Sequence, residues 1–258
     1  MSKRVTYIVI AILSVAMLLS LSFDSETDSV KERRVKVEES FNHDISAYTQ
    51  GLFFYDNILY ETTGNYGSSS LRRVDLKSGN VLSKIVYDKN YFAEGSCAID
   101  GRLYVLTWME HKCFVYDIKT MKQIGEFYNP REGWGLTTDG KDLIMSDGST
   151  KLFFLDPMTF VERRSVEVTL DGKPLGSLNE LEYIEGEIWA NVYGSDYIVI
   201  IDPKTGKVKT KVDCRNLLPA SLRRADTDVL NGIAYNPVTG YIYLTGKNWP
   251  KLYRISIY

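Results

Sequence analysis

The stretch Gly51-Leu-Phe-Phe-Tyr-Asp-Asn-Ile-Leu-Tyr60 joins two short apolar runs through an Asp-Asn turn. Two apolar runs on either side of a tight polar turn are typical of a β-hairpin. The same pattern recurs four more times, in the segments that begin at Gly95, Gly135, Glu180 and Gly232. A repeat of about 40–50 residues with four strands per unit is typical of a β-propeller. The sequence therefore predicts an all-β chain folded as a five-bladed β-propeller.

A second repeated feature is an Asp at the end of an apolar run, followed three residues later by Ser or Thr. It occurs once in each of four units, at Asp75, Asp117, Asp156 and Asp202. An Asp side chain in this position can accept backbone N–H bonds from the turn that follows. We therefore expect these residues to hold the turn into the outermost strand of each blade, and not to bind a metal.

The fifth unit lacks that Asp because the chain stops at Tyr258, after a third strand at Lys251–Ile257. The segment Arg34–Phe41 has a strand-like pattern and precedes the first blade. We predict that it supplies the missing outer strand of blade five, which would close the ring and protect an exposed sheet edge. A short helix is expected within Leu217–Arg224, between blades four and five.

The N-terminal residues have the pattern of a targeting segment. Lys3 and Arg4 precede 19 uncharged residues, Val5–Phe23, and acidic residues follow. Because about 20 apolar residues span a bilayer, residues 1–23 are predicted to be a secretory signal peptide or an uncleaved membrane anchor. Basic residues before the segment favour an extracytoplasmic domain, periplasmic or secreted, that stays on the membrane if the segment is not cleaved. Residues 24–33 are then a flexible tether, and residues 34–258 form the propeller domain.

The composition excludes several kinds of partner. A net charge of −2 does not supply the basic surface that nucleic-acid binding requires. The chain has 2 His and 3 Cys in no zinc-ligand spacing, which argues against a zinc site. Cys97 and Cys113 are expected on the first and third strands of blade two, too far apart for a disulfide. These two residues and Cys214 are therefore predicted to be buried thiols.

Five residues lead directly into the five hairpins, and a propeller brings these leading residues together at one end of its central channel. They are Gln50, Glu94, Trp134, Asn179 and Asn231. The second strands run to the same face, which adds Trp108, Trp189 and Lys247. Each has a structural alternative, because a Trp often packs between blades and an amide often satisfies a loop.

Glu94 is the strongest candidate for a catalytic group. It follows Tyr91 and Phe92, so we expect its carboxyl to be buried among aromatic side chains. Burial of a carboxyl is costly and raises its pKa towards neutrality. A carboxyl with such a pKa can act as a general acid/base.

The chain resembles the plant and bacterial type of glutaminyl-peptide cyclotransferase in six motifs that occur in the family's order. The motifs are Tyr48-Thr-Gln-Gly-Leu52, Phe92-Ala-Glu-Gly95, Leu106-Thr-Trp108, Gly133-Trp-Gly-Leu136, Asn179-Glu-Leu-Glu182 and Ile188-Trp-Ala-Asn-Val192. The resemblance runs from about Val35 to the C-terminus. It implies a five-bladed propeller that converts an N-terminal glutamine to pyroglutamate and releases ammonia without a catalytic metal. Peptides and proteins with N-terminal Gln are then the partners, no cofactor is required, and a monomer is expected.

The resemblance also implies a role for each motif residue. Glu94 would be the acid/base. Gln50 and Asn179 would hydrogen-bond the substrate, and Lys247 would lie near the reacting amide. The pocket walls would be formed by Phe92, Trp108, Trp134 and Trp189, with Tyr48 at a wall position where relatives are expected to have Phe.

Other kinds of protein fit parts of the pattern. A non-catalytic extracytoplasmic propeller that binds a peptide or a sugar would use the same aromatic and amide side chains, but has no need of a buried Glu94. A metal-dependent lactonase or hydrolase would need a cluster of metal ligands at the channel. Oxygen atoms of Asn179, Glu180 and Asn231 also leave a structural calcium ion as an alternative.

Overall fold

Residues 29–258 are described by the computed structural model, and their regular structure is almost entirely β-strand, as predicted. The single helical segment among them is a 3₁₀ turn, η1 (Ala220–Leu222), inside the segment where a short helix was expected. In this part of the chain no helix has the length and apolar character that a membrane crossing needs. The predicted signal or anchor segment, residues 1–23, and the first half of the predicted tether, residues 24–28, lie outside the described residues.

Three four-stranded antiparallel sheets follow one another along the chain, and each begins with one of the predicted hairpins. Unit 1 contains β2 (Thr49–Tyr55), β3 (Ile58–Thr63), β4 (Ser70–Val74) and β5 (Val81–Val86). Unit 2 contains β6 (Ala93–Ile99), β7 (Arg102–Thr107), β8 (Lys112–Asp117) and β9 (Lys122–Tyr128). Unit 3 contains β10 (Leu136–Thr138), β11 (Leu143–Ser146), β12 (Lys151–Leu155) and β13 (Glu162–Glu167).

An eight-stranded sheet contains the last two repeats. Unit 4 consists of β16 (Leu178–Ile184), β17 (Glu187–Val192), β18 (Tyr197–Ile201) and β19 (Val208–Asp213). Unit 5 consists of β20 (Leu230–Asn236), β21 (Tyr241–Gly246), β22 (Lys251–Ile257) and the N-terminal strand β1 (Lys31–Asn42). A small separate hairpin, β14 (Thr169–Leu170) and β15 (Lys173–Pro174), connects units 3 and 4.

Strand β1 completes unit 5, as the sequence predicted. It runs antiparallel to β22, with Val35 opposite Ile257 and Asn42 opposite Lys251. Its first residues also pair in parallel with β19 of unit 4, from Lys31 onward, and this second pairing was not predicted. Residues 31–33 are therefore part of a strand, and their assignment to a flexible tether is wrong because β19 supplies their backbone with hydrogen-bond partners.

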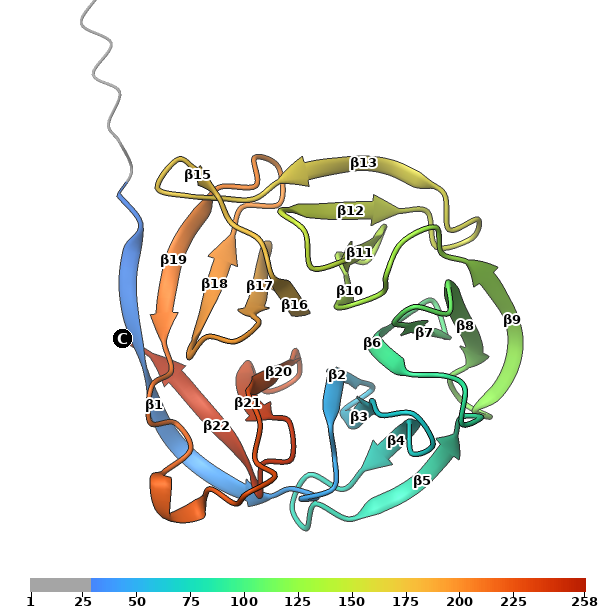
Figure 1. Ribbon diagram of the computed structural model, residues 1–258, viewed down its shortest axis with the longest axis horizontal. Coiled ribbons are helices and arrows are strands. Elements are labelled where there is room, and N and C mark those ends of the chain that lie inside the picture. Colours follow the sequence, from blue (N-terminus) through green and yellow to red (C-terminus); the bar gives the residue numbers. More distant parts are fainter. Residues whose placement is uncertain (1–28) are drawn as a thin grey trace, which may run out of the picture.

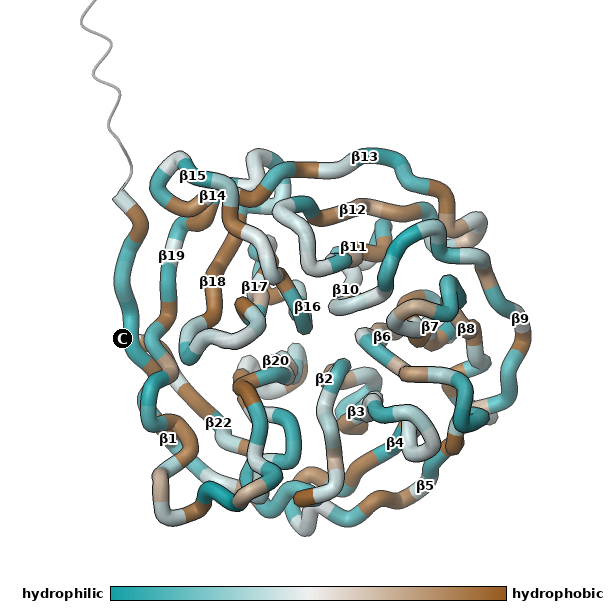
Figure 2. The backbone as a smooth tube through the Cα atoms, in the orientation of Figure 1, coloured by the Kyte–Doolittle hydropathy of each residue, from teal (hydrophilic) through white to brown (hydrophobic). Residues whose placement is uncertain are grey.

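The five units lie side by side around a common centre, with β2, β6, β10, β16 and β20 innermost (Figure 1). Each innermost strand contacts the next, and β20 contacts β2, so the ring is closed. Strands in the middle of a unit, such as β12 and β18, are hydrophobic and buried, whereas the outer strands β9 and β13 are mostly exposed (Figure 2). The hydrophobic core is therefore divided into layers between neighbouring units.

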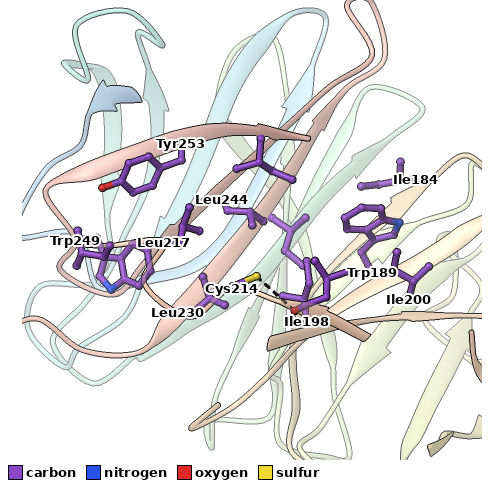
Figure 3. Packing of buried hydrophobic residues seen from close by; sticks show 14 residues of the cluster. Ile184, Trp189, Ile198, Ile200, Cys214, Leu217, Leu230, Leu244, Trp249 and Tyr253 are labelled. Atoms are coloured by element: carbon purple, nitrogen blue, oxygen red, sulfur yellow. Dashed lines mark hydrogen bonds between the residues drawn. The ribbon is translucent and has the colours of Figure 1, made fainter. Parts of the chain in front are cut away.

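Alternation along the strands distributes side chains between these layers. In β17, Ile188 and Ala190 pack towards unit 3, whereas Trp189 packs in the layer between units 4 and 5. Figure 3 shows Trp189 in this second layer with Ile198 and Ile200. The three cysteines are buried and free, as predicted, and burial raises the pKa of each thiol.

The four repeated Asp residues hold turns, as expected from their spacing. The carboxylate of Asp75 accepts the backbone N–H of Ser78 at 2.8 Å, and that of Asp117 accepts the N–H of Thr120 at 2.8 Å. Asp156 and Asp202 make the same contact with the third residue that follows. Each turn leads into the fourth strand of its unit, so these carboxylates have a structural role.

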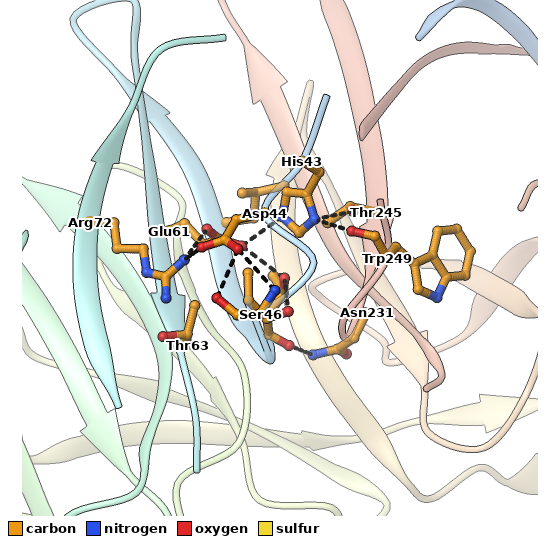
Figure 4. Close-up of polar contacts among 12 residues, drawn as sticks. His43, Asp44, Ser46, Glu61, Thr63, Arg72, Asn231, Thr245 and Trp249 are labelled. Atoms are coloured by element: carbon orange, nitrogen blue, oxygen red, sulfur yellow. Dashed lines mark hydrogen bonds and ion pairs between the residues drawn. The ribbon is translucent and has the colours of Figure 1, made fainter. Parts of the chain in front are cut away.

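A buried polar cluster centred on His43 lies where units 5 and 1 meet (Figure 4). His43 Nε2 lies 2.9 Å from Glu61 Oε1 in β3, and His43 Nδ1 lies 2.7 Å from the carbonyl oxygen of Trp249. Burial opposes protonation of His43, but the Glu61 carboxylate outweighs it and the pKa of His43 is raised. Burial likewise opposes ionisation of Glu61, yet His43 and Arg72 keep the pKa of Glu61 below its usual value. The cluster thus connects His43, in the β1–β2 loop, to Glu61 in unit 1 and to Trp249 in unit 5, the two units between which the ring closes.

Candidate active site

Bulges at the start of the innermost strands place four of the five leading residues. In units 1, 2, 4 and 5 the pairing register between the first two strands shifts at this point. The residues in these bulges include Gln50, Glu94, Asn179 and Asn231, so they lie inside the strands and not before them as expected. Trp134 precedes β10. Since a bulge re-aims a side chain, the innermost strands can direct these residues away from the interlayer packing.

Glycine after a leading residue allows the innermost strands to approach closely. A Cβ atom on Gly95 would lie 2.5 Å from the backbone nitrogen of Leu136 in the next unit. Gly232 in β20 also has a φ of +119°, a conformation that other residues rarely adopt. The ring is therefore narrow at this level, which brings side chains from different units to one pocket.

That pocket has a volume of about 250 Å³. Its lining residues are Tyr48, Gln50, Phe92, Glu94, Trp108, Trp134, Asn179, Tyr193 and Lys247. The structure thus brings together eight of the nine residues to which the sequence assigned a role in catalysis or substrate binding, whereas Asn231, expected at the same end of the channel, does not line the pocket. They come from units 1, 2, 4 and 5 and from the loop before unit 3, so only the closed ring assembles the site.

Trp189 is the exception, and the prediction that it lines the pocket is wrong. It lies in the middle of β17, opposite Ile200 of β18, and only 4% of its surface is exposed. Its side chain points into the layer between units 4 and 5, because successive residues of a strand face opposite sides. It therefore contributes packing energy and does not reach the site.

Tyr193 replaces Trp189 at the pocket and was missed in the sequence. It is the first residue after β17, just as Trp108 is the first after β7 and Lys247 the first after β21. The rule that located Trp108 and Lys247 would have selected Tyr193 if the end of β17 had been placed at Val192. The tryptophan four residues earlier was the more conspicuous side chain.

Glu94 and Lys247 are the two ionisable groups buried in the pocket, with 5% and 3% of their surfaces exposed. Glu94 Oε1 accepts a hydrogen bond from Gln50 Nε2 at 3.0 Å. Burial raises the pKa of Glu94 well above its usual value, the carboxylates of Glu110 and Glu132 raise it further, and Lys247 opposes them. Burial lowers the pKa of Lys247, opposed by Glu94 and Asp228. Burial thereby makes the charged form of each group less favourable than it is in water.

Aromatic rings form the walls. Phe92 packs edge-on against Trp108 at 5.6 Å between ring centres, and Trp134 packs edge-on against Tyr193 at 5.8 Å. The carboxylate of Glu132 accepts both indole N–H groups, at 2.9 Å from Trp108 and 3.1 Å from Trp134. One residue of the β9–β10 loop therefore fixes the positions of two walls, and nothing in the sequence motifs pointed to it.

Tyr48 adds a hydroxyl to the wall, and the structure gives that hydroxyl a partner. It donates a hydrogen bond to Asp228 Oδ2 at 2.9 Å, and burial together with this bond raises the pKa of Tyr48. The Lys247 ammonium lies 4.7 Å from the centre of the Tyr48 ring and 5.2 Å from that of Tyr193. Two tyrosine rings thus stabilise the buried cation through cation–π contacts.

Asn179 has an unused hydrogen-bonding group at the pocket. Its Oδ1 atom is buried and has no partner among the described residues, and the side chain is 3% exposed. A buried polar atom without a hydrogen-bond partner is costly, and this one lies on a residue that lines the pocket. The arrangement is suited to a ligand that supplies a donor.

Glu180, one of the three oxygen ligands considered for calcium, is engaged by the backbone. Its two carboxylate oxygens accept the N–H groups of Leu52 at 3.1 Å and Ile233 at 2.8 Å. Within residues 29–258 no group of three or more His, Cys, Asp and Glu side chains is arranged to hold a metal ion. The Glu180 carboxylate joins β16 to β2 and β20 across the ring, which is a structural role.

The fold and the site together define a class of protein: an all-β ring in which a buried carboxyl, a buried ammonium group and amides share an aromatic pocket. The family model described as glutamine cyclotransferase matches residues 9–257. The chain belongs to this family, which confirms the resemblance inferred from its motifs.

Individual relatives agree with this assignment. Over 227 residues the chain is 40% identical to a glutaminyl-peptide cyclotransferase of Arabidopsis thaliana, a match that covers 86% of this chain and 71% of that protein. The crystal structure of Myxococcus xanthus glutaminyl cyclase superposes with a TM-score of 0.83 at 33% identity, covering 89% of this chain and 98% of the other. A luciferin-regenerating enzyme, 12% identical with a TM-score of 0.53 over 81% of this chain and 77% of its own, shares the fold alone.

Proposed function

We propose that this protein cyclises the N-terminal glutamine of peptides and proteins to pyroglutamate and releases ammonia, without a catalytic metal. The single observation that carries the proposal is Glu94, a buried carboxyl with a raised pKa, held by Gln50 inside a pocket of aromatic residues. A protein that only binds a ligand has no need of such a group. Family membership supports the same reaction.

The pocket suits one amino-acid side chain. At about 250 Å³ it is smaller than pockets for drug-sized ligands, which begin at about 300 Å³. We place the glutamine side chain between the aromatic walls, with its amide NH₂ donating to Asn179 Oδ1. The rest of the peptide then lies outside, beside the half-exposed Tyr193 and Tyr66.

The reaction needs no nucleophile from the protein. The neutral α-amine of the substrate attacks the carbon of its own γ-amide, and the new C–N bond closes a five-membered lactam. Holding both ends of one molecule in contact supplies much of the rate, since oriented intramolecular reactions have large effective molarities. The aromatic walls do this by restricting the flexible glutamine side chain.

Glu94 moves the proton. As a carboxylate it accepts the proton that the attacking amine loses, and as an acid it gives that proton to the γ-nitrogen. Ammonia then departs as the original C–N bond breaks, and Glu94 is again a carboxylate. The amine has a pKa of about 8, so Glu94, whose pKa is raised by burial, is a better matched base for it than an ordinary carboxylate.

The ammonium group of Lys247 and the Nδ2 group of Asn179 stabilise the oxyanion that develops on the γ-carbonyl oxygen. Lys247 is a cation buried in the same pocket as Glu94, and donors in a site with little water act strongly on developing charge. The amide of Gln50 is less suited to this task, because its Nε2 already donates to Glu94. Its remaining N–H is free to face the substrate.

The architecture that supports this site is, in our proposal, a five-bladed β-propeller in which β1 completes the fifth blade. We further propose that residues 1–23 export the domain, as a signal peptide or as a membrane anchor, and that it acts as an extracytoplasmic monomer. N-terminal sequencing of the mature protein from fractionated cells checks the export step, since a start beyond residue 23 establishes cleavage and an intact N-terminus in the membrane fraction establishes an anchor.

The decisive experiment is ammonia release from a short peptide that begins with Gln, incubated with the purified protein with and without a strong chelator. We expect release in both samples, together with loss of the peptide's free amine and of about 17 mass units, which is the mass of ammonia. Release abolished by the chelator would overturn the metal-independent mechanism. No release by a folded sample would instead favour a ligand-binding propeller.

A further inference from the structure

A chain of hydrogen bonds runs from a backbone carbonyl through two buried amides to Glu94. Asn231 Nδ2 donates to the carbonyl oxygen of Thr49 at 2.9 Å and to Gln50 Oε1 at 3.3 Å. Gln50 Nε2 in turn donates to Glu94 Oε1 at 3.0 Å. The chain joins units 5, 1 and 2, and the three side chains are 0%, 3% and 5% exposed.

The orientation of both amide groups in this chain follows from the contact between Asn231 and the carbonyl oxygen of Thr49. The two ends of an amide group have nearly the same shape, so hydrogen-bond partners decide which end points where. A backbone carbonyl can only accept, so the Asn231 atom that faces Thr49 must be the nitrogen. That nitrogen also faces Gln50, which must therefore present its oxygen there and its nitrogen to Glu94.

We infer that Asn231 is a positioning residue, which fixes the Gln50 amide so that Glu94 Oε1 always accepts a hydrogen bond and Glu94 Oε2 carries the exchangeable proton. The inference rests on the proposed cyclisation. Asn231 does not line the pocket and touches no reacting atom, so it acts through Gln50. It serves to keep the proton on the Glu94 oxygen that Gln50 does not engage.

The orientation of Gln50 also affects how readily Glu94 ionises. A donated N–H bond favours the carboxylate, as does the Lys247 ammonium, whereas burial and the carboxylates of Glu110 and Glu132 favour the neutral acid. If the Gln50 amide were reversed, Glu94 would face an oxygen and would need its proton to make a hydrogen bond. Reversal therefore raises the pKa of Glu94, and the pH above which it acts as a base rises with it.

Asn231→Asp is the substitution that reverses the amide. An ionised Asp side chain has no donor, and a protonated one uses its O–H on the carbonyl oxygen of Thr49. In both cases the carboxyl oxygen that takes the place of Asn231 Nδ2 faces Gln50, accepts a hydrogen bond from Gln50 Nε2 and turns that group away from Glu94. We expect the acid limb of the pH profile of kcat/KM to move up by about one to two pH units, the size of one hydrogen bond to a charged group.

Asn191→Asp is the matched control. Asn191 is 1% exposed, and its Oδ1 accepts the backbone N–H of Gly232, the residue after Asn231, at 2.9 Å. An Asp there keeps that acceptor and adds the same negative charge nearby, but no hydrogen bond connects it to Gln50 among the described residues. The acid limb of this variant should stay close to that of the wild-type enzyme. An equal shift of the acid limb in both variants would mean that added negative charge alone causes it, and would overturn the inference.

A double-mutant cycle separates positioning from a general structural effect. In a Gln50→Leu background, Asn231→Asp should cause no further movement of the acid limb, because the residue through which Asn231 acts is gone. The same shift with and without Gln50 would overturn the inference. If Asn231→Asp does not fold, Asn231→Leu takes its place: it leaves Gln50 free to adopt both orientations, and a smaller upward shift is expected.

A spectroscopic readout keeps this test independent of the proposed reaction. The infrared difference between the wild-type protein and Glu94→Gln gives the carboxyl stretch of Glu94, and its pH titration gives the pKa directly. The same titration with Asn231 substituted should be shifted upward by about one to two pH units. A wild-type protein that releases no ammonia would refute the cyclisation, whereas an unshifted titration would refute the role of Asn231.

Discussion

Replacing Glu94 with Gln removes one function of that side chain and leaves the others. Gln has the same shape and can still accept the hydrogen bond from Gln50 Nε2, but it cannot carry a proton. A positioned general acid/base contributes about 10²–10⁴-fold to a rate. At about 1.36 kcal/mol per factor of ten this is about 3–5 kcal/mol of activation free energy. We therefore expect kcat to fall about 10²–10⁴-fold while KM changes little.

The fold should tolerate this substitution. Glu94 forms no ion pair with any described residue, and its pKa is raised mainly by burial. A carboxyl whose pKa is raised on folding lowers stability at pH values above its unfolded pKa, because its charged form is buried. A neutral amide removes that cost. The free energy of unfolding at neutral pH should stay unchanged or increase, which separates lost chemistry from lost structure.

The assay measures ammonia and pyroglutamate from one Gln-initiated peptide over a range of concentrations. Glu182→Gln is the control, because Glu182 is also buried, burial raises its pKa to about 8, and it lies outside the pocket. Glu182 binds the backbone N–H of Tyr235, an acceptor role that Gln retains. Glu94→Gln with kcat within about tenfold of the wild type would refute the assignment, as would an equal loss in the control.

Two further substitutions test the walls and the ring closure. Glu132→Leu removes the acceptor of both indole N–H groups, so KM should rise about tenfold, the value of one hydrogen bond, and Glu132→Gln should restore it. His43→Leu removes the nearest charged partner of the buried Glu61 carboxylate and should lower the free energy of unfolding by about 3–5 kcal/mol. The His43 contribution is fully present below its usual pKa of 6.5, and is lost as pH rises through its raised pKa, so urea titrations should show a smaller loss in alkaline buffer.

Much of the fold could be predicted because its information is local. The five hairpins and the four turn-holding Asp residues repeat at regular spacing, and Arg34–Phe41 is a strand pattern with no partner nearby in the sequence. The parallel pairing of Lys31–Arg33 with β19 could not be predicted in this way. Those residues are charged and resemble a solvated tether, and their partners lie far along the chain. Only the closed ring shows that a second edge is available to them.

Most pocket residues could be predicted from the topology of the fold. The one wrong assignment to the pocket walls also has an identifiable cause. Leading residues and strand ends fall on one face in this fold, so a rule about position located most of the pocket. Trp189 was chosen because it is a tryptophan, although the positional rule selects Tyr193, the first residue after β17. The roles of Glu132 and Asp228 were not predictable, because these side chains contact the pocket walls from loops whose conformation no repeat specifies.

The separation between Glu94 and Lys247 explains the direction in which the pKa of each group is shifted. They are buried in one pocket and each affects the pKa of the other, yet no ion pair joins them among the described residues. A direct contact would hold both in their charged forms, because an opposite charge at short range lowers the pKa of a carboxyl and raises that of an ammonium group. At a greater separation burial dominates, and it raises the pKa of Glu94 and lowers the pKa of Lys247. Unit 2 supplies the acid and unit 5 the cation, so the ring itself maintains the distance that allows Glu94 to gain and lose a proton in each turnover.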